Sequence, residues 1–398
     1  MRVLVTGSAG PVQPDGAWPG PRDPRAPEPA AAGGGTHAPT PREVATWWFP
    51  GRADAAGATG ATAVPVALAA SRPAFLDALA GVAPELLAAV VPGEDGTDVP
   101  VAVRRDPRTA TVYVDASQVP AVGGTTPAPR SSAALGHLLA HAADAARTPD
   151  GRPGRVVVAT GGARSHDAGA GLLGALAGRV PSGHGPTTAE TLRSARSTLG
   201  GAALVAAVAT DAPLLGLHGT SAALAARGVD DAVAQDLERR LGAVAHDVGS
   251  AVETLDREGL GAVAGRDLLA ASSSRRLATV PGTGSGGGAA FALAALGGRL
   301  VPALAVVADA VGLDAHLAAA DLVVVVVDEL AAHELGEGVV HEVARRAARH
   351  ALPVVVVART VVAGRREQAA AGLSGAHAWG DGSARALVER VARTWSRA

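Results

Sequence analysis

The five consecutive valines from Val323 to Val327 constrain the fold of this chain more than any other segment. A run of β-branched residues without polar alternation is typical of a strand covered on both faces by helices, which indicates a parallel sheet in an α/β fold. Asp328 and Glu329 follow the valines directly. Ligands of such folds bind beyond the carboxyl ends of the strands, so Asp328 is a candidate catalytic carboxylate, and a solvated strand end is the alternative.

A glycine-rich turn, residues 282–288, precedes this strand and leads into an apolar helix expected over residues 289–296. Backbone N–H groups and the dipole at the start of a helix can bind an anion such as phosphate. A tight turn that lets two segments approach closely explains the same glycines equally well. The candidate phosphate-binding residues of this turn are Gly282, Gly284, Ser285 and Gly286.

The composition narrows the classes of function. A chain of 398 residues with 48% hydrophobic residues is long enough for two domains with substantial cores. The net charge of −2 gives no reason to expect nucleic acid or an anionic membrane surface as a partner. Cysteine is absent, which excludes disulfides and thiolate metal sites. No segment is typical of a signal peptide or a membrane span, which predicts a soluble cytoplasmic protein.

All 35 basic residues are arginine, since the chain contains no lysine. A cation placed on a phosphate must therefore be a guanidinium.

Strands and helices are expected to alternate along the chain, which predicts an α/β architecture. Short runs of β-branched and small residues predict strands over residues 2–6, 61–69, 99–103, 110–115, 155–160, 202–209 and 352–357. Apolar periodicity predicts helices over residues 132–145, 170–177, 232–245, 341–350 and 384–395. Residues 11–41 are rich in Pro, Gly and Ala and are expected to be disordered. A capping-box pattern at Thr40, Pro41 and Glu43 predicts the start of a helix.

Two further acids follow predicted strands in the middle of the chain. Asp211 comes after the strand at 202–209, and Asp167 lies in the polar loop 161–169 after the strand at 155–160. Strand-end carboxylates can hold Mg²⁺ or accept the proton of a hydroxyl group. Both are candidate catalytic residues, and Gly161, Gly162 and Ser165 of the same loop are candidate substrate- or phosphate-binding residues.

Four segments together resemble the bacterial-type glycerate kinase family, in its actinobacterial-like branch. They are residues 161–176, 210–224 and 281–288, with the tail segments 362–368 and 388–395. The resemblance implies a Rossmann-like parallel-sheet domain built from residues 1–80 and 282–398, with a second α/β domain, residues 81–281, inserted in the middle. It also implies ATP-dependent phosphoryl transfer to a glycerate-like hydroxy acid, with ATP and Mg²⁺ as cofactors.

The resemblance places Asp167 and Asp211 on family aspartates, and Arg227 on a phosphate-binding lysine. Other positions depart from the family pattern. The segment Gly7-Ser8-Ala9-Gly10 stands where the family has Asp-Ser-Phe-Lys-Gly, and Val327, Ala331 and Gly338 stand at a family glutamate, aspartate and lysine.

Three hypotheses remain open. An active kinase would have rebuilt its site with Asp328, Glu329 or Arg227. A catalytically inactive homologue would keep the scaffold as a ligand-binding or regulatory protein, because the folding residues survive while several charged positions are lost. A different transferase could use Arg227, Asp211 and Asp328. The spacing of His333, Glu334, Glu337 and His341 matches no recognised metal motif, so no metal site is predicted there. The oligomeric state stays open.

Overall fold

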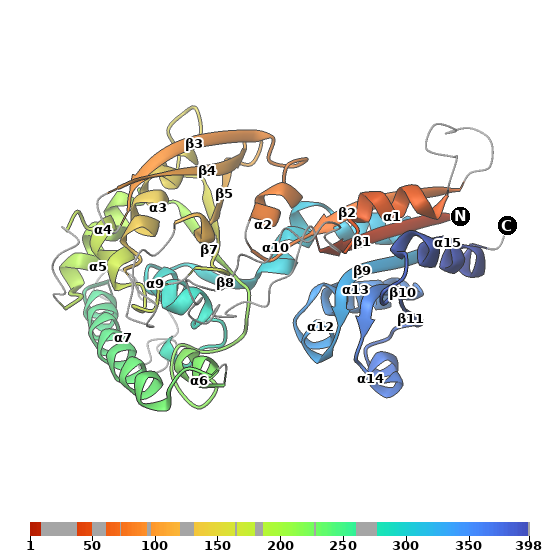
Figure 1. The fold of residues 1–398 in the computed structure, drawn as a ribbon. Coiled ribbons are helices and arrows are strands. Elements are labelled where there is room, and N and C mark those ends of the chain that lie inside the picture. The colour runs from red at the N-terminus through yellow and green to blue at the C-terminus, as the bar shows by residue number, and fades with distance from the viewer. Residues whose placement is uncertain are drawn as a thin grey trace. The chain divides into compact units, whose positions relative to one another are not determined.

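The computed structural model describes residues 1–8, 38–49, 61–71, 73–93, 97–119, 131–163, 165–179, 186–226, 228–259 and 277–396. The described residues divide into two compact units. Those up to Ala69 and from Leu304 onward form the first unit, and those between Ala70 and Ala303 form the second. Each unit contains one sheet with helices packed against it (Figure 1), which confirms the expected α/β class. Among the described helices, none is both long enough and apolar enough to cross a bilayer.

The first unit is built on a five-stranded sheet in the order β11-β10-β9-β1-β2. Every neighbouring pair in it is parallel. The five valines lie in the central strand and are almost completely buried, as the absence of polar alternation predicts. The strands are β1 (Arg2–Ser8), β2 (Thr62–Leu68), β9 (Leu322–Leu330), β10 (Val354–Val361) and β11 (Gly375–Ala378).

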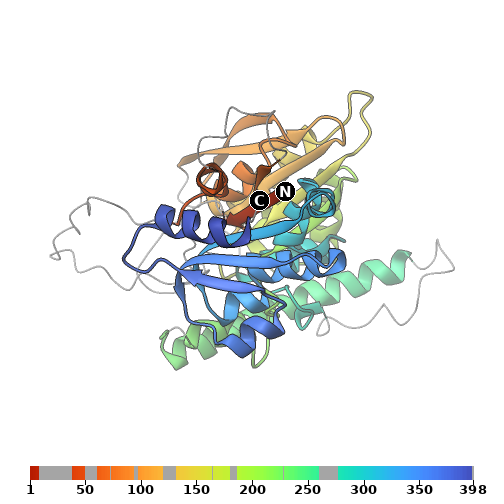
Figure 2. The same cartoon turned by 90° about the vertical axis from the view of Figure 1, so that its right-hand side faces the viewer.

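Helices cover both faces of this sheet (Figures 1 and 2). On one face, α1 (Pro41–Trp48) and α15 (Ala384–Trp395) enclose a core around Val324 and Val326. On the other face, α13 (Val339–Ala347) packs against β1, β9 and β10. The remaining helices of the unit are α10 (Ala303–Ala310), which begins at its boundary, α11 (Leu313–Ala318), α12 (Ala332–Gly336), the short 3₁₀ turn η3 (Ala348–His350) and α14 (Arg365–Ala370).

The expected capping box at the start of α1 is confirmed. Thr40 Oγ1 accepts a hydrogen bond from the N–H of Glu43 at 3.3 Å, and the Glu43 carboxylate accepts one from the N–H of Thr40 at 2.8 Å. Two N–H groups at the helix start are thereby satisfied. Of the segment 11–41, which is expected to be disordered, the structure describes residues 38–41. Residues 11–37 lie outside the described part of the chain.

Asp328 and Glu329 occupy the carboxyl end of strand β9, as the sequence predicts. Strand β9 continues to Leu330, because β10 runs on beside it and pairs Thr360 with Glu329. Asp328 therefore lies within the sheet, where its carboxylate forms an ion pair with Arg359 of β10 at 2.5 Å.

The second unit contains a six-stranded sheet in the order β3-β4-β5-β6-β7-β8. The pairs β3–β4 and β4–β5 are antiparallel, and the others are parallel. Its strands are β3 (Glu85–Pro92), β4 (Asp98–Asp106), β5 (Thr111–Asp115), β6 (Arg155–Ala159), β7 (Ala203–Val208) and β8 (Arg299–Pro302).

The core of the second unit consists mainly of Val, Leu and Ala side chains, and its buried aromatic residues include Phe291 and Phe75. One helix, α7, spans 29 residues and is about twice as long as the sequence pattern predicted. The α-helices are α2 (Pro73–Ala78), α3 (Ala133–Ala145), α4 (Ala170–Leu176), α5 (Ala189–Thr198), α6 (Thr220–Ala225), α7 (Asp231–Gly259) and α9 (Ala289–Ala295), and the 3₁₀ turns are η1 (Ala116–Gln118) and η2 (Ser285–Gly288).

The glycine-rich turn 282–288 belongs to the second unit, together with α9 and β8. Strand β8 hydrogen-bonds along β7, pairing Val205 with Arg299, and α9 packs against both strands. A domain boundary at residues 281/282 would separate β8 from its sheet. In the structure the units instead meet in sequence at the start of α10.

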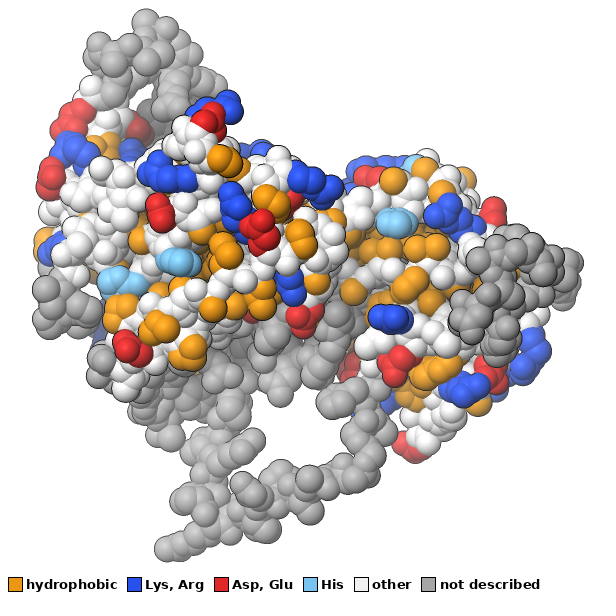
Figure 3. Space-filling view, turned by 90° about the horizontal axis from the view of Figure 1, so that it is seen from above, with side chains coloured by type: hydrophobic (Ala, Val, Ile, Leu, Met, Phe, Trp, Pro, Cys, Tyr) orange, Lys and Arg blue, Asp and Glu red, His pale blue; other side chains and the backbone are white. Residues whose placement is uncertain are grey.

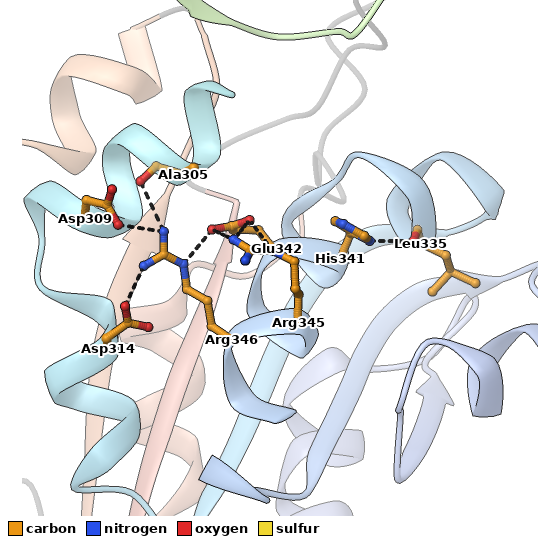
Figure 4. A network of polar contacts seen from close by, with 8 residues as sticks. All are labelled: Ala305, Asp309, Asp314, Leu335, His341, Glu342, Arg345 and Arg346. Atoms are coloured by element: carbon orange, nitrogen blue, oxygen red, sulfur yellow. Dashed lines mark hydrogen bonds and ion pairs between the residues drawn. The ribbon is translucent and has the colours of Figure 1, made fainter. Parts of the chain in front are cut away.

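A buried guanidinium joins three helices of the first unit (Figure 4). Arg346 of α13 is 4% exposed and donates to Glu342 at 2.5 Å, to Asp309 of α10 at 2.7 Å and to Asp314 of α11 at 3.0 Å. Glu342 also accepts hydrogen bonds from its neighbour Arg345. A planar guanidinium suits such a site because its donors are fixed in direction and it stays charged.

Replacing Arg346 with methionine should lower the free energy of unfolding by about 3 kcal/mol, because the buried Glu342 loses its buried partner. Urea denaturation followed by circular dichroism would measure the loss. The control is Arg345→Met, which removes a more exposed donor to the same carboxylate and should cost about 1 kcal/mol or less. Equal losses in the two variants would contradict the role of the buried cluster.

Candidate functional site

The candidate site of the second unit lies where β6 and β7 end. Thr160 follows β6, and its hydroxyl lies 2.8 Å from the hydroxyl of Ser285. Ser285 Oγ also accepts a hydrogen bond from the N–H of Ala209, after β7, at 3.2 Å. Thr160 and Ser285 are buried. The Ser285 hydroxyl therefore links the glycine-rich turn to the ends of two neighbouring parallel strands.

Further hydrogen bonds hold the turn to the segment after β7. The N–H of Gly282 donates to the carbonyl of Asp211 at 2.8 Å, and the N–H of Gly284 donates to the carbonyl of Ala212 at 2.9 Å. Thr283 Oγ1 accepts from the N–H of Leu214 at 3.0 Å. The N–H of Ser285 donates to the carbonyl of Gly282 at 3.1 Å, so three of the N–H groups expected to face a phosphate are used within the protein.

The turn also packs closely against the loop 161–169. Gly286, Gly287 and Gly288 all have left-handed backbone angles, which favour glycine. A Cβ atom at Gly287 would lie 1.6 Å from the carbonyl oxygen of Ser165, and one at Gly286 would lie 2.7 Å from that of Thr160. These glycines are required by close approach of two backbone segments, which favours the tight-turn interpretation over the phosphate cradle.

Replacing Gly287 with alanine should lower the free energy of unfolding by more than about 3 kcal/mol, because the methyl group overlaps a carbonyl that cannot move freely. The matched control is Gly297→Ala, which also has positive φ but has no atom within 4 Å of the added Cβ. Backbone strain alone should cost the control about 1–2 kcal/mol. Thermal and urea unfolding would compare the two, and similar losses would show that contact with the loop is unimportant.

Asp167 holds together the starts of two helices. Its Oδ2 accepts hydrogen bonds from the N–H of Ser132 at 2.8 Å, the hydroxyl of Ser132 at 2.9 Å and the N–H of Gly171 at 3.0 Å. Its Oδ1 accepts from the N–H of Gly169 at 2.9 Å. Burial raises the pKa of this carboxyl above its ordinary value, and the four hydrogen bonds oppose that rise. The arrangement is that of a capping residue for α3 and α4.

Replacing Asp167 with asparagine should lower the free energy of unfolding by about 1–3 kcal/mol, because an NH₂ group would replace an oxygen that accepts hydrogen bonds from N–H groups. Chemical denaturation would measure the effect. The control is Asp144→Asn on the exposed face of α3, which should change stability by about 0.5 kcal/mol or less. A purely catalytic Asp167 would give a variant as stable as the control.

Asp211 is the candidate carboxylate that is available to a ligand. It is exposed just after β7, and no described residue forms a hydrogen bond to its carboxylate. Asp328 lies in the first unit and is paired with Arg359. Arg227 lies outside the described residues. The structure thus places the three candidate carboxylates in different chemical situations.

The remaining candidates lie in the loop after β6. Gly161 forms an isolated parallel bridge with Ser71, and Gly162 adopts positive φ in the turn that follows. Ser165 is buried, and its carbonyl lies against Gly287. The residues that the structure gathers around the ends of β6 and β7 are Gly161, Gly162, Ser165, Asp167, Asp211, Gly282, Gly284, Ser285 and Gly286.

Sequence reasoning missed the hydroxyl residues that organise this site. Thr160, Thr283 and Ser132 each tie two segments together. The sequence positions of these residues could have indicated their role, because a serine or threonine at a strand end or just before a helix often forms a hydrogen bond with nearby backbone.

No three His, Asp or Glu side chains in the described part of the chain are grouped as a metal site. His341 Nδ1 lies 3.0 Å from the carbonyl of Leu335, and the Glu334 carboxylate accepts a hydrogen bond from the N–H of Val340 at 3.3 Å. Burial raises the pKa of Glu334, against the opposing effect of that bond. The structure gives both groups local partners.

Comparison with known proteins gives a consistent family. A sequence model described as the glycerate kinase family matches residues 73–393. Uncharacterised proteins of Mycobacterium bovis and Mycobacterium tuberculosis are each 30% identical over 297 residues, covering 73% of this chain and 68% of theirs. The crystal structure of a putative glycerate kinase 2 from Salmonella typhimurium LT2 matches with a TM-score of 0.65 and 18% identity, covering 100% of this chain and 98% of that one. The chain belongs to the glycerate kinase family.

Proposed function

We propose that this protein transfers a phosphoryl group from ATP to a small hydroxy acid of the glycerate type. The observation that carries the proposal is the exposed Asp211 carboxylate at the end of β7. In an α/β fold, the carboxyl ends of parallel strands are where ligands bind. Family membership supports the reaction class.

Asp211 fits one of two tasks in such a reaction. Mg²⁺ bound with nucleotide phosphates takes only one or two protein carboxylates, and the phosphates and water supply its other ligands. The same carboxylate could accept the proton of the attacking hydroxyl group. When bound, Mg²⁺ would offset the negative charge that develops on the phosphoryl oxygens.

The cation of the site would be arginine, because the chain has no lysine. Arg227, at the position of a family lysine, is the residue we assign to the phosphates. A guanidinium can bind two phosphate oxygens at once.

A second candidate function is a catalytically inactive homologue that binds a ligand or regulates a partner. The engagement of two candidate carboxylates favours it, since Asp167 caps two helices and Asp328 is paired with Arg359. Val327, Ala331 and Gly338, which the family resemblance places at positions of a glutamate, an aspartate and a lysine, support it further.

Calorimetric titration with Mg·ATP, and separately with glycerate, followed by a coupled ADP-release assay, distinguishes the two functions. If the protein is a kinase, both ligands bind and Asp211→Asn lowers kcat/KM by roughly 100-fold or more, a typical cost of losing one group that stabilises the transition state. Asp144→Asn, an exposed carboxylate on α3, is the matched control and should keep wild-type turnover.

Two other outcomes would contradict the kinase function. Binding without turnover in the wild-type protein would establish the inactive homologue. Absence of binding by a folded protein would contradict both functions for these ligands.

A further inference from the structure

Strand β3 forms the edge of the second unit's sheet and carries an apolar outer face. Its side chains alternate, so Leu87, Ala89 and Val91 turn toward the core while the residues between them face solvent. Leu86 is 59% exposed and Val90 is 63% exposed. Figure 1 shows β3 outermost in its sheet, and Figure 3, viewed from that side, shows hydrophobic side chains at the surface there.

The backbone N–H and C=O groups of the exposed residues of β3 point away from the sheet. Gln118 accepts a hydrogen bond from the N–H of Ala102 at 2.8 Å and donates one to its carbonyl at 2.8 Å. Ala102 of β4 lies opposite Ala88 of β3, so these two are a pair without mutual hydrogen bonds.

Because bonded and non-bonded pairs alternate in an antiparallel ladder, the direction of the N–H and C=O groups is then known for every residue of β3. The N–H of Gly93 donates to the carbonyl of Thr97 at 2.7 Å, which places the odd-numbered residues in bonded pairs with β4. Leu86, Ala88 and Val90 therefore direct their N–H and C=O groups to the free edge. No described residue forms a hydrogen bond with these groups.

Within the described residues, β3 carries none of the sequence devices that usually prevent strand addition along its central part. Native edge strands are commonly protected by lysine, central proline, a bulge or an inward-pointing charge. Residues 86–91 contain only Leu, Ala and Val, and their pairing with β4 has no bulge. Glu85 is held by Arg105 within the same hairpin at 2.9 Å, and Pro92, which has no N–H group, ends the strand.

We propose that β3 pairs antiparallel with β3 of a second copy of this chain, around a two-fold axis that passes beside Ala88. A two-fold axis perpendicular to the sheet brings together identical strands in antiparallel order, with the same face of each copy on the same side. Leu86 of each copy then lies opposite Val90 of the other, and Ala88 lies opposite Ala88.

This register matches both the backbone and the side chains. The outward N–H and C=O groups of Leu86, Ala88 and Val90 form about six hydrogen bonds across the interface. Their side chains form three apolar cross-strand pairs, which stabilise a sheet. Because no charged residue lies between Leu86 and Val91, like charges do not oppose each other along this segment. Self-complementarity of this kind favours a second copy over an unrelated strand.

The test uses single cysteines in the full-length protein, which has none of its own. In the proposed dimer, the two cysteines of the Ala88→Cys variant form a hydrogen-bonded pair. Their Cα atoms lie about 5.5 Å apart, a distance that a disulfide can bridge. The matched control is Ala102→Cys, its neighbour on β4, because one additional strand spacing in each copy separates those Cα atoms by about 15 Å. Mild oxidation and non-reducing electrophoresis report the cross-link.

Sedimentation velocity over a range of concentrations reports self-association of the unmodified protein. We expect a dimer that Ala88→Glu weakens at least tenfold in dissociation constant, since two carboxylates would meet at the axis. Ala88 is exposed, so circular dichroism should show an unchanged fold.

The proposal is supported by a wild-type dimer together with an Ala88→Cys cross-link and no Ala102→Cys cross-link. A monomer at all concentrations, a dimer that Ala88→Glu leaves intact, or equal cross-linking of both cysteines would overturn it. The test involves neither ATP nor a hydroxy acid, so its result is independent of the proposed enzyme function.

Discussion

The close contact between the turn 286–288 and the loop 161–169 determines how the second unit's site is built. Two backbone segments more than 100 residues apart in sequence meet with no room for a Cβ atom between Gly287 and Ser165. The contact fixes the positions of Ser285, Asp167 and the ends of β6 and β7 relative to one another. Glycine is used there because it permits both the left-handed backbone and the short distance. The glycine-rich pattern is thus explained first by packing, and any role toward an anion must use groups that this contact leaves available.

Much of the fold could be read from the sequence where local rules act alone. The buried valines of β9 and the capping box of α1 were predicted because burial on both faces and side-chain capping each leave a short, regular signature. The order of strands in the two sheets depends on long-range pairing, which leaves no comparable local signature. The start of α7, where Asp230 accepts hydrogen bonds from the N–H groups of Ala232 and Val233, was predicted within one residue, while its C-terminal end was placed 14 residues too early.

The candidate site was less readable, because a residue type does not reveal its partners. Asp167, Asp211 and Asp328 all come at or near strand ends in the sequence, yet one caps two helices, one is exposed and one pairs with Arg359. These partners come from segments distant in sequence, so spacing along the chain could not show them. The strand-end position of Asp328 was predicted correctly, but its ion pair with Arg359 of β10 was not. Family membership narrows the chemistry, while the individual carboxylates decide how much of it this chain retains.

The hydrogen bonds of Gln118 to Ala102 separate two parts of one sheet. Strand β4 pairs with β5 only from Arg104 to Asp106, and nearer its start the amide of Gln118 takes the place of a neighbouring strand. The outer half of the β3–β4 hairpin is consequently held by the Gln118 amide and by the packing of Val91 and Val101 into the core, rather than by a continuous ladder of backbone hydrogen bonds. Substitutions there can alter the surface of the hairpin without shifting β6 and β7, which carry the candidate site. In evolutionary terms, the edge that would control assembly and the strands that would control chemistry can diverge independently.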